Sequence, residues 1–368
     1  SDDQEQLRDA VSKWVERGYD FERRRGITAA GGFSRDAYNE LAELGLTGLT
    51  LSEPLGGLGM GPVESMVVME ALGHGIVLEP LAQALMAGVL LSNYAQPAVQ
   101  QAWAGPLATG EALMVLATQE RKNRYRLDQC TTQAERQGDG WVLNGTKLFI
   151  TNGVHADVYF VAAKTGPGKH QMSMFIVEKG TPGFTVGRSL EKTGWLCSDT
   201  AELVFDNVRL GPQALLGEQD KGFYALMKNL QTERIALAAM AVGHCQRAIA
   251  LTLDYVRQRQ AFGQRLWDMQ HIRQRVAMLD AKTRAARQFM YHCAWSVTQG
   301  HDIVQEVSML KALTGDLVNE VVGGCLQFWC GMGYMREAPI ERLWRDARVL
   351  AIGGGATEVM LEEVAKRY

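Results

Sequence analysis

One segment of this 368-residue sequence carries both a candidate proton acceptor and a candidate anion-binding stretch. Glu233 stands beside Arg234 near the start of a long, mostly apolar helical pattern. The stretch 257–263 (Arg-Gln-Arg-Gln-Ala-Phe-Gly) follows about 36 Å further on if the helix is continuous. Burial among apolar side chains raises the pKa of a carboxylate, so Glu233 can act as a general base near neutral pH. The basic stretch suits a phosphate-bearing cofactor, and the pairing favours a redox enzyme over a binding module.

Each candidate also has an ordinary structural explanation. Glu233 could be a solvated helix carboxylate, although its apolar neighbours weaken that interpretation. Arg257 and Arg259 could form an exposed basic face, but Gly263 permits close backbone approach to a ligand. The stretch 149–153 (Phe-Ile-Thr-Asn-Gly) could end a strand, or its Thr hydroxyl and aromatic ring could hold a planar ring system. The glycines 353–355 could be a flexible loop, or a nest of backbone N–H groups.

The elements that position these residues fall into three regions. Residues 1–112 show helical periodicity, with Ser34 as a candidate N-cap and a Gly-rich turn at 54–59. Residues 113–212 contain short β-rich runs, and Asn144-Gly145 predicts a hairpin between 141–143 and 148–150. Further strands are expected at 158–161, 174–177 and 201–205. Residues 213–368 return to long helical periods, broken near Gly263, Gly300 and Gly331. We therefore expect a mainly α protein with a central β-domain.

Several function classes are disfavoured by composition and motifs. The sequence has no GxGxxG after a strand, no Walker loop and no HExxH, so nucleotide and zinc-protease sites of those kinds are unsupported. Its six cysteines form no CxxC pair, and its seven histidines lack metal-ligand spacing. The net charge of −3 gives no general attraction to nucleic acid or membrane. The longest apolar run, 81–91, is too short to span a bilayer. We expect a soluble cytoplasmic protein without a secretory signal.

With these segments in place, the chain resembles acyl-CoA dehydrogenases nearly end to end. Seven stretches carry the resemblance in the family's order: 51–59, 141–153, 217–222, 259–263, 327–334, 345–348 and the terminal Gly-rich loop. The resemblance implies an N-terminal helical domain, a middle β-barrel-like domain and a C-terminal four-helix bundle. It also implies a homodimer or homotetramer, with FAD bound between the β-domain and the bundle and a neighbouring subunit completing the site.

The resemblance assigns FAD contacts residue by residue. Ala117 and Thr118 would meet the pyrimidine edge of the flavin. Phe149, Ile150 and Thr151 would line the isoalloxazine, with Thr151 near N5. The contacts to the pyrophosphate and adenosine, made across the subunit boundary, would be Arg259, Phe262, Gln270, Gln327 and Gly331. Beside the terminal loop, FAD would be contacted by Thr357 and Glu358.

The resemblance also indicates which residue is the base. Many family members carry the catalytic Glu in the terminal loop, where this chain has Gly354. A minority, similar to isovaleryl-CoA and long-chain dehydrogenases, carry it on the bundle helix just before an Arg, as in Glu233-Arg234. Glu233 would then remove the α-proton of an acyl-CoA while the β-hydrogen passes as hydride to flavin N5, giving a trans-2-enoyl-CoA. The Gly355 N–H would stabilise the enolate-like charge, and an electron-transfer flavoprotein would reoxidise the flavin.

Two stretches depart from the family pattern. Residues 119–126 (Gln-Glu-Arg-Lys-Asn-Arg-Tyr-Arg) replace a Glu-Pro and Ser-Asp segment, and we hypothesise that their four basic side chains, Arg124 among them, meet CoA phosphates. Arg234 is a further candidate substrate contact. Residues 328–330 (Phe-Trp-Cys) replace smaller residues and could crowd the adenine end of FAD. Two alternatives remain: a flavin oxidase or monooxygenase on the same scaffold, and a subunit of a heteromeric dehydrogenase.

Overall fold

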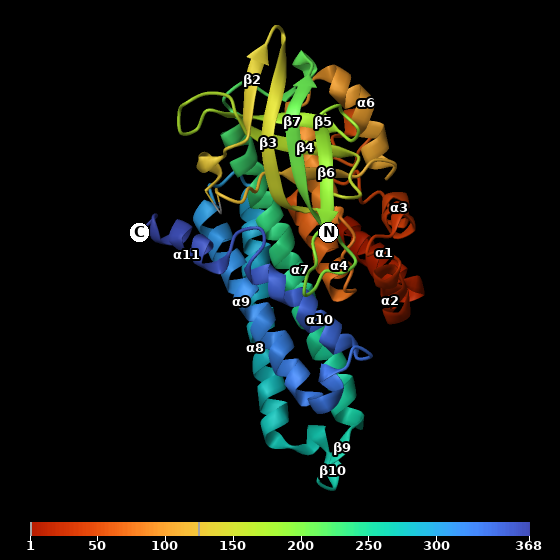
Figure 1. Cartoon of the computed structure of the whole chain (residues 1–368). Helices are drawn as coiled ribbons and strands as arrows, with labels where there is room; N and C mark the ends of the chain where they lie inside the picture. Colours follow the sequence, from red (N-terminus) through yellow and green to blue (C-terminus); the bar gives the residue numbers. More distant parts are fainter. Residues whose placement is uncertain (1, 124–125) are drawn as a thin grey trace.

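The computed structural model describes residues 2–123 and 126–368, and its parts follow one another along the chain (Figure 1). The N-terminal part consists of α1 (Asp2–Gly18), α2 (Phe21–Ala29), α3 (Arg35–Glu43), α4 (Pro62–His74), α5 (Leu81–Tyr94) and α6 (Pro97–Ala108). Ser34 caps α3 as predicted, because its hydroxyl accepts a hydrogen bond of 3.1 Å from the Ala37 N–H.

The central part is one eight-stranded sheet with the order β6-β7-β3-β2-β4-β5-β8, in which β1 pairs with β4. Its strands are β1 (Met114–Ala117), β2 (Gln133–Gln137), β3 (Gly140–Thr151), β4 (Val158–Lys164), β5 (Met172–Glu178), β6 (Phe184–Ser189), β7 (Thr200–Leu210) and β8 (Leu215–Leu216). The strands predicted from 158, 174 and 201 onward are confirmed in β4, β5 and β7.

The predicted hairpin at Asn144-Gly145 is wrong. The strand β3 runs straight through this dipeptide, and the actual hairpin joins β2 to β3 around Gly138, whose φ is +64°. Gly145 instead marks a register shift in the pairing of β3 with β7. A Cβ there would lie 2.7 Å from the Thr132 Cα, so the glycine permits a close backbone approach rather than a turn.

The C-terminal part is a helical bundle that extends away from the sheet (Figure 1). It contains α7 (Gly222–Gln258), the short strands β9 (Gln260–Ala261) and β10 (Gln264–Arg265), α8 (Gln270–Thr298), α9 (Val304–Phe328), α10 (Pro339–Ala347) and α11 (Thr357–Ala365). In the described chain, α7 is long and apolar enough to cross a membrane, but 72% of its most apolar window is buried inside the protein, as expected of a core helix. The mainly α architecture with a central sheet is therefore confirmed.

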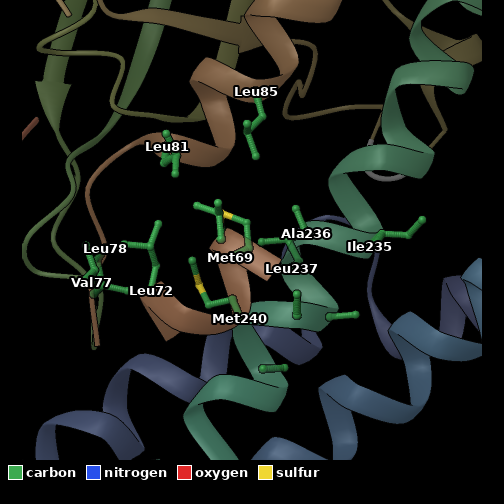
Figure 2. Packing of buried hydrophobic residues seen from close by; sticks show 14 of the residues in the cluster. Met69, Leu72, Val77, Leu78, Leu81, Leu85, Ile235, Ala236, Leu237 and Met240 are labelled. Carbon is green, nitrogen blue, oxygen red and sulfur yellow. The ribbon is translucent and has the colours of Figure 1, made fainter. Parts of the chain in front are cut away.

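Two glycines allow α4 and α7 to cross at backbone contact. A Cβ on Gly243 would lie 2.2 Å from the Glu70 carbonyl oxygen, and one on Gly73 would lie 2.5 Å from the Met240 carbonyl oxygen. Around this crossing, apolar side chains of α4, α5 and α7, such as Leu72 and Leu237, pack together (Figure 2). The crossing fixes the position of α7 along its axis relative to the N-terminal helices, and with it the position of Glu233.

Replacement of Gly243 by Ala is expected to lower the free energy of unfolding by roughly 1–3 kcal/mol, because the methyl group must push apart two backbones rather than a flexible side chain. A thermal melt followed by circular dichroism measures this. Gly26→Ala on α2 is the matched control: nothing lies within 4 Å of its added Cβ, so the helix should gain slightly in stability. Equal melting temperatures for Gly243→Ala and the wild type would contradict the close-contact argument.

Candidate active site

A cavity of about 460 Å³ lies where the end of β3, the loop before β7, α5, α7 and the terminal Gly-rich loop meet. The N-terminal helices contribute Gln83 and Met86, and α7 contributes Glu233, Leu237 and Met240. Spacings of four and three residues place the α7 side chains on one helix face. The cavity thus has a largely apolar wall that carries one carboxylate from the bundle.

The environment of Glu233 matches the general-base prediction. Burial raises the pKa of this carboxyl above its usual range, while the charges of Arg234 and Lys311 oppose the rise. The carboxylate stands at the cavity wall, where a ligand proton can reach it. A base with an elevated pKa, held in an apolar pocket beside a ligand site, is suited to removing a weakly acidic proton.

Gly354, the position in the terminal loop that has no side chain to carry a carboxylate, lies beside Glu233. A Cβ on Gly354 would lie 3.7 Å from the Glu233 Oε1. A carboxylate carried by the loop at 354 would therefore reach the same part of the cavity as the one that α7 carries. The same Cβ would lie 2.2 Å from the Leu237 Cδ1, and Gly354 has a φ of +64°. A side chain at 354 would therefore require Leu237 to move and would strain the backbone.

The end of β3 forms the opposite wall and is strained. Thr151 and Asn152 line the cavity, and both Phe149 and Asn152 have a φ of 59°. Left-handed φ is costly for a bulky residue such as Phe and concentrates at functional sites. The Phe149 ring is 61% exposed, and the buried side-chain amide of Asn152 has no hydrogen-bond partner in the described structure. This wall is therefore suited to a planar, hydrogen-bonding ligand.

The loop before β7 supplies cavity residues that the sequence reasoning missed. Trp195 has a φ of 53°, and its backbone N–H donates to the Asp346 Oδ1 at 2.6 Å while its indole donates to the Asp346 carbonyl at 2.9 Å. Burial lowers the pKa of Lys192 to about 8, against the charges of Asp199 and Asp346. The stretch 345–348 was recognised as a motif, but nothing in the sequence connects it to Trp195.

The other residues predicted to act near the cavity do not line it. Ala117 and Ile150 are buried in the β-domain core, and the Thr118 carbonyl accepts from the Lys147 Nζ at 3.3 Å. Gly355 follows the two lining glycines, and its N–H has no acceptor among the residues that the structure describes. Arg234 does not line the cavity; its charge interacts first with Glu233 and then with Glu363 and Arg367 near the end of the chain.

The predicted pyrophosphate and adenosine contacts lie at the other end of the bundle, near β9 and β10 (Figure 1). All five are exposed, and Phe262 at the hairpin tip is 94% exposed with a φ of 54°: Arg259, Phe262, Gln270, Gln327 and Gly331. Trp329 does not crowd this surface, because its ring stacks on Tyr255 at 4.2 Å between centroids. Within one chain, these residues therefore lie away from the cavity. Their role across a subunit boundary stays a prediction.

Thr357 and Glu358 begin α11 after the Gly-rich loop. The Thr357 hydroxyl is buried and donates to the Asp316 Oδ1 at 3.0 Å, whereas Glu358 is exposed. Thr357 thus anchors the loop to α9, and only Glu358 is free to meet a ligand from solvent. Their assignment as FAD contacts stays a prediction.

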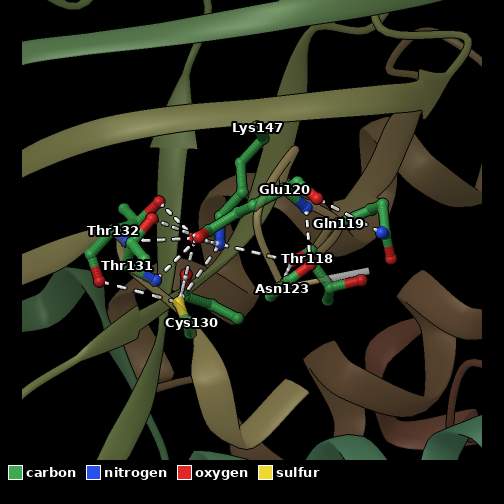
Figure 3. Close-up of polar contacts among 9 residues, drawn as sticks. Thr118, Gln119, Glu120, Asn123, Cys130, Thr131, Thr132 and Lys147 are labelled. Atoms are coloured by element: carbon green, nitrogen blue, oxygen red, sulfur yellow. Dashed lines mark hydrogen bonds and ion pairs between the residues drawn. The ribbon is translucent and has the colours of Figure 1, made fainter. Parts of the chain in front are cut away.

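The atypical stretch 119–126 is anchored by a buried ion pair. The Lys147 Nζ lies 2.7 Å from the Glu120 Oε1, and Thr131 and Thr132 donate to the same carboxylate through backbone and hydroxyl groups (Figure 3). Of the basic side chains in this stretch, Arg121 and Lys122 are exposed and Arg126 pairs with Asp128 at 2.8 Å. Arg124 lies outside the described residues. None of the three described side chains lines the cavity.

Comparison with known proteins accounts for the whole chain. The N-terminal, middle and C-terminal domains of acyl-CoA dehydrogenase match residues 1–111, 116–208 and 220–368. The chain belongs to the acyl-CoA dehydrogenase family. It is 34% identical over 349 residues to the mouse mitochondrial long-chain specific acyl-CoA dehydrogenase, covering 92% of this chain and 80% of that protein. The mitochondrial isovaleryl-CoA dehydrogenase of Pongo abelii is 30% identical, with 98% and 87% covered.

A solved acyl-CoA dehydrogenase from Geobacillus kaustophilus superposes with a TM-score of 0.94 at 33% identity, covering 100% of this chain and 98% of that one. The chain is thus an oxidoreductase, and FAD is the cofactor of its family. The cavity fits this group. The Thr151 hydroxyl and the unpartnered Asn152 amide line it and provide hydrogen bonds for a flavin ring, and the exposed Phe149 ring, which is not part of the lining, offers an aromatic surface two residues earlier on β3.

Proposed function

We propose that this acyl-CoA dehydrogenase family member oxidises an acyl-CoA between its α- and β-carbons to a trans-2-enoyl-CoA, with Glu233 as the base. The observation that carries the proposal is the Glu233 carboxylate on the cavity wall, with a burial-raised pKa and the side-chain-free Gly354 beside it. No other residue of the terminal loop facing that point carries a carboxylate: the lining residues there are Ile352, Gly353 and Gly354.

The residues divide the work between them. Glu233 takes the α-proton onto its carboxylate, and the electron pair of that C–H bond becomes the new C=C bond as the β-hydrogen leaves with its own electron pair. FAD, when bound, would supply the acceptor for that β-hydrogen, which leaves as hydride. The Gly355 N–H supports negative charge on the thioester oxygen, because it has no acceptor within the described protein. Leu237, Met240 and Met86 exclude water from the reacting carbons.

The proposal includes partners. At the far end of the bundle, five residues would complete the FAD site of a second copy in a homodimer or homotetramer: Arg259, Phe262, Gln270, Gln327 and Gly331. An electron-transfer flavoprotein would then take the electrons from the reduced cofactor. The exposed Phe262 at the tip of the β9–β10 hairpin supports the first of these partners, since this bulky residue has a left-handed φ and is 94% exposed on the single chain.

Anaerobic titration of the purified flavoprotein with a panel of acyl-CoAs tests the proposal. At least one acyl-CoA is expected to bleach the visible flavin band completely at one equivalent per site, and the product is expected to be the trans-2-enoyl-CoA by mass spectrometry. Reduced protein that reacts with air faster than with an electron-transfer flavoprotein would instead identify an oxidase. A protein that binds acyl-CoA without bleaching would contradict the dehydrogenation.

A further inference from the structure

A buried lysine next to the active site lies outside the β-domain and takes no part in the chemistry proposed above. Lys311 lies on α9 and is 1% exposed. Its Nζ donates to the Leu350 carbonyl at 2.9 Å and also to the Gly355 carbonyl. These two carbonyls bracket the segment 351–354, which includes the part of the Gly-rich loop that forms the cavity wall. One ammonium group therefore joins both ends of the loop to the bundle.

The conformation of the Gly-rich loop depends on these hydrogen bonds from Lys311. Gly354 and Gly355 have φ values of +64° and +105°, a conformation that glycine adopts freely but does not hold by itself. Neither of their N–H groups has an acceptor in the described protein. Among residues 2–123 and 126–368, the one other side-chain hydrogen bond at this end of the loop is that of Thr357 to Asp316. The hydrogen bonds from the Lys311 Nζ to the two backbone carbonyls thus fix the position of the loop relative to Glu233.

The same ammonium group acts on Glu233 electrostatically. Burial lowers the pKa of Lys311 to about 8, with Glu233 and Asp316 acting against that change and Arg234 adding to it. Below that pH Lys311 is positively charged and favours the ionised form of Glu233. The charged groups around the pair are Arg234 on α7 and Asp316 on α9, with Glu363 and Arg367 reached through Arg234.

We propose that Lys311 is a positioning residue for the dehydrogenation: it sets the distance between the Gly-rich loop and Glu233, and its charge keeps the base ionised before substrate binds. The inference rests on the proposed function of Glu233. It joins the two parts of the site, because one side chain of a third helix holds the loop that would receive the thioester and acts electrostatically on the base that would remove the α-proton.

The test is the pH dependence of anaerobic single-turnover bleaching, with Lys311→Met, Lys311→Gln and Lys311→Arg compared in the FAD-loaded protein. Loss of the positive charge in the Met and Gln variants is expected to raise the apparent pKa of the base by about one unit or more, so the rate below that pKa falls about tenfold. Lys311→Arg keeps the charge and is expected to keep the wild-type apparent pKa. Amide hydrogen exchange of the segment 350–356 is expected to accelerate in the Met variant whether or not the flavin is reduced.

Lys282→Met is the matched control, because this lysine of the same bundle pairs with Glu320 at 2.9 Å on the surface. It should change neither the apparent pKa nor the exchange of the loop. If the Met variant does not fold, the Gln variant, which keeps an uncharged NH₂ donor group, decides through the pH profile. A wild-type pH profile and wild-type loop exchange in a folded Met or Gln variant would overturn the role of Lys311. Absence of bleaching in the wild type would refute the proposed function instead, and leave the exchange result as the measure of loop fastening.

Discussion

Replacement of Glu233 by Gln is expected to slow the anaerobic bleaching of the flavin by an acyl-CoA by about 10²–10⁴-fold, the usual contribution of a general base. Gln has the shape of Glu but cannot accept the α-proton. Because Glu233 lies on the cavity wall rather than in the core of the fold, the variant should still fold, retain FAD and bind the acyl-CoA. Stopped-flow absorbance gives the rate, and a spectral titration gives the binding constant.

The pH dependence of the wild type follows from the raised pKa of Glu233. The base is active when ionised, so the bleaching rate is expected to be highest above this pKa and to fall as the pH drops through it. Glu191→Gln is the matched control, since Glu191 is another carboxylate at the cavity but is exposed and lies on the opposite loop. A Glu233→Gln protein that bleaches within threefold of the wild-type rate would assign the base to another group.

Replacement of Glu120 by Gln is expected to lower the free energy of unfolding by about 3–5 kcal/mol, because it leaves Lys147 buried without its counter-charge. Both side chains of this pair are almost completely inaccessible to solvent, and the carboxylate also accepts from Thr131 and Thr132 (Figure 3). The change should appear as a lower urea midpoint. Asp280→Asn, which breaks the exposed pair of Asp280 with Arg284, should cost less than about 1 kcal/mol.

The same pair gives a stability that depends on pH. Burial alone would raise the pKa of Glu120, but the charge and hydrogen bond of Lys147 and the bonds of the two threonines outweigh it, so the pKa is lowered. A lowered folded-state pKa stabilises the protein above the unfolded-state value of about 4, and this contribution is lost as the pH falls toward the folded-state pKa. The deficit of the Gln variant should therefore shrink in acid. A deficit that stays constant from pH 7 to pH 3 would contradict the lowered folded-state pKa of Glu120.

Sequence patterns were sufficient where the determinants are local. Hydrophobic periodicity gave the long bundle helices, and Ser34 gave a helix start, because each depends on neighbours within a few residues. Glu233 emerged from its apolar flanks and its adjacent Arg234. The resemblance to the family, rather than a local pattern, implied that the terminal loop supplies no base, because Gly354 stands where many members carry the catalytic Glu.

Long-range contacts account for what the sequence could not show. Asn144-Gly145 has the composition of a hairpin, but Thr132 packs against the glycine and keeps the strand extended. Trp195 takes its place in the cavity because it bonds to Asp346, 151 residues away. Lys311 is one polar residue in an apolar helix, and only the fold shows that two loop carbonyls surround it.

The packing of Leu237 against Gly354 bears on whether the carboxylate could be relocated from the helix to the loop by substitution. A Glu at 354 would place its Cβ 2.2 Å from the Leu237 Cδ1, so the leucine side chain would have to move. The new residue would also have to adopt the left-handed φ of +64° that glycine has there. A redesigned enzyme with its base on the loop therefore calls for a smaller side chain at 237 in the same variant.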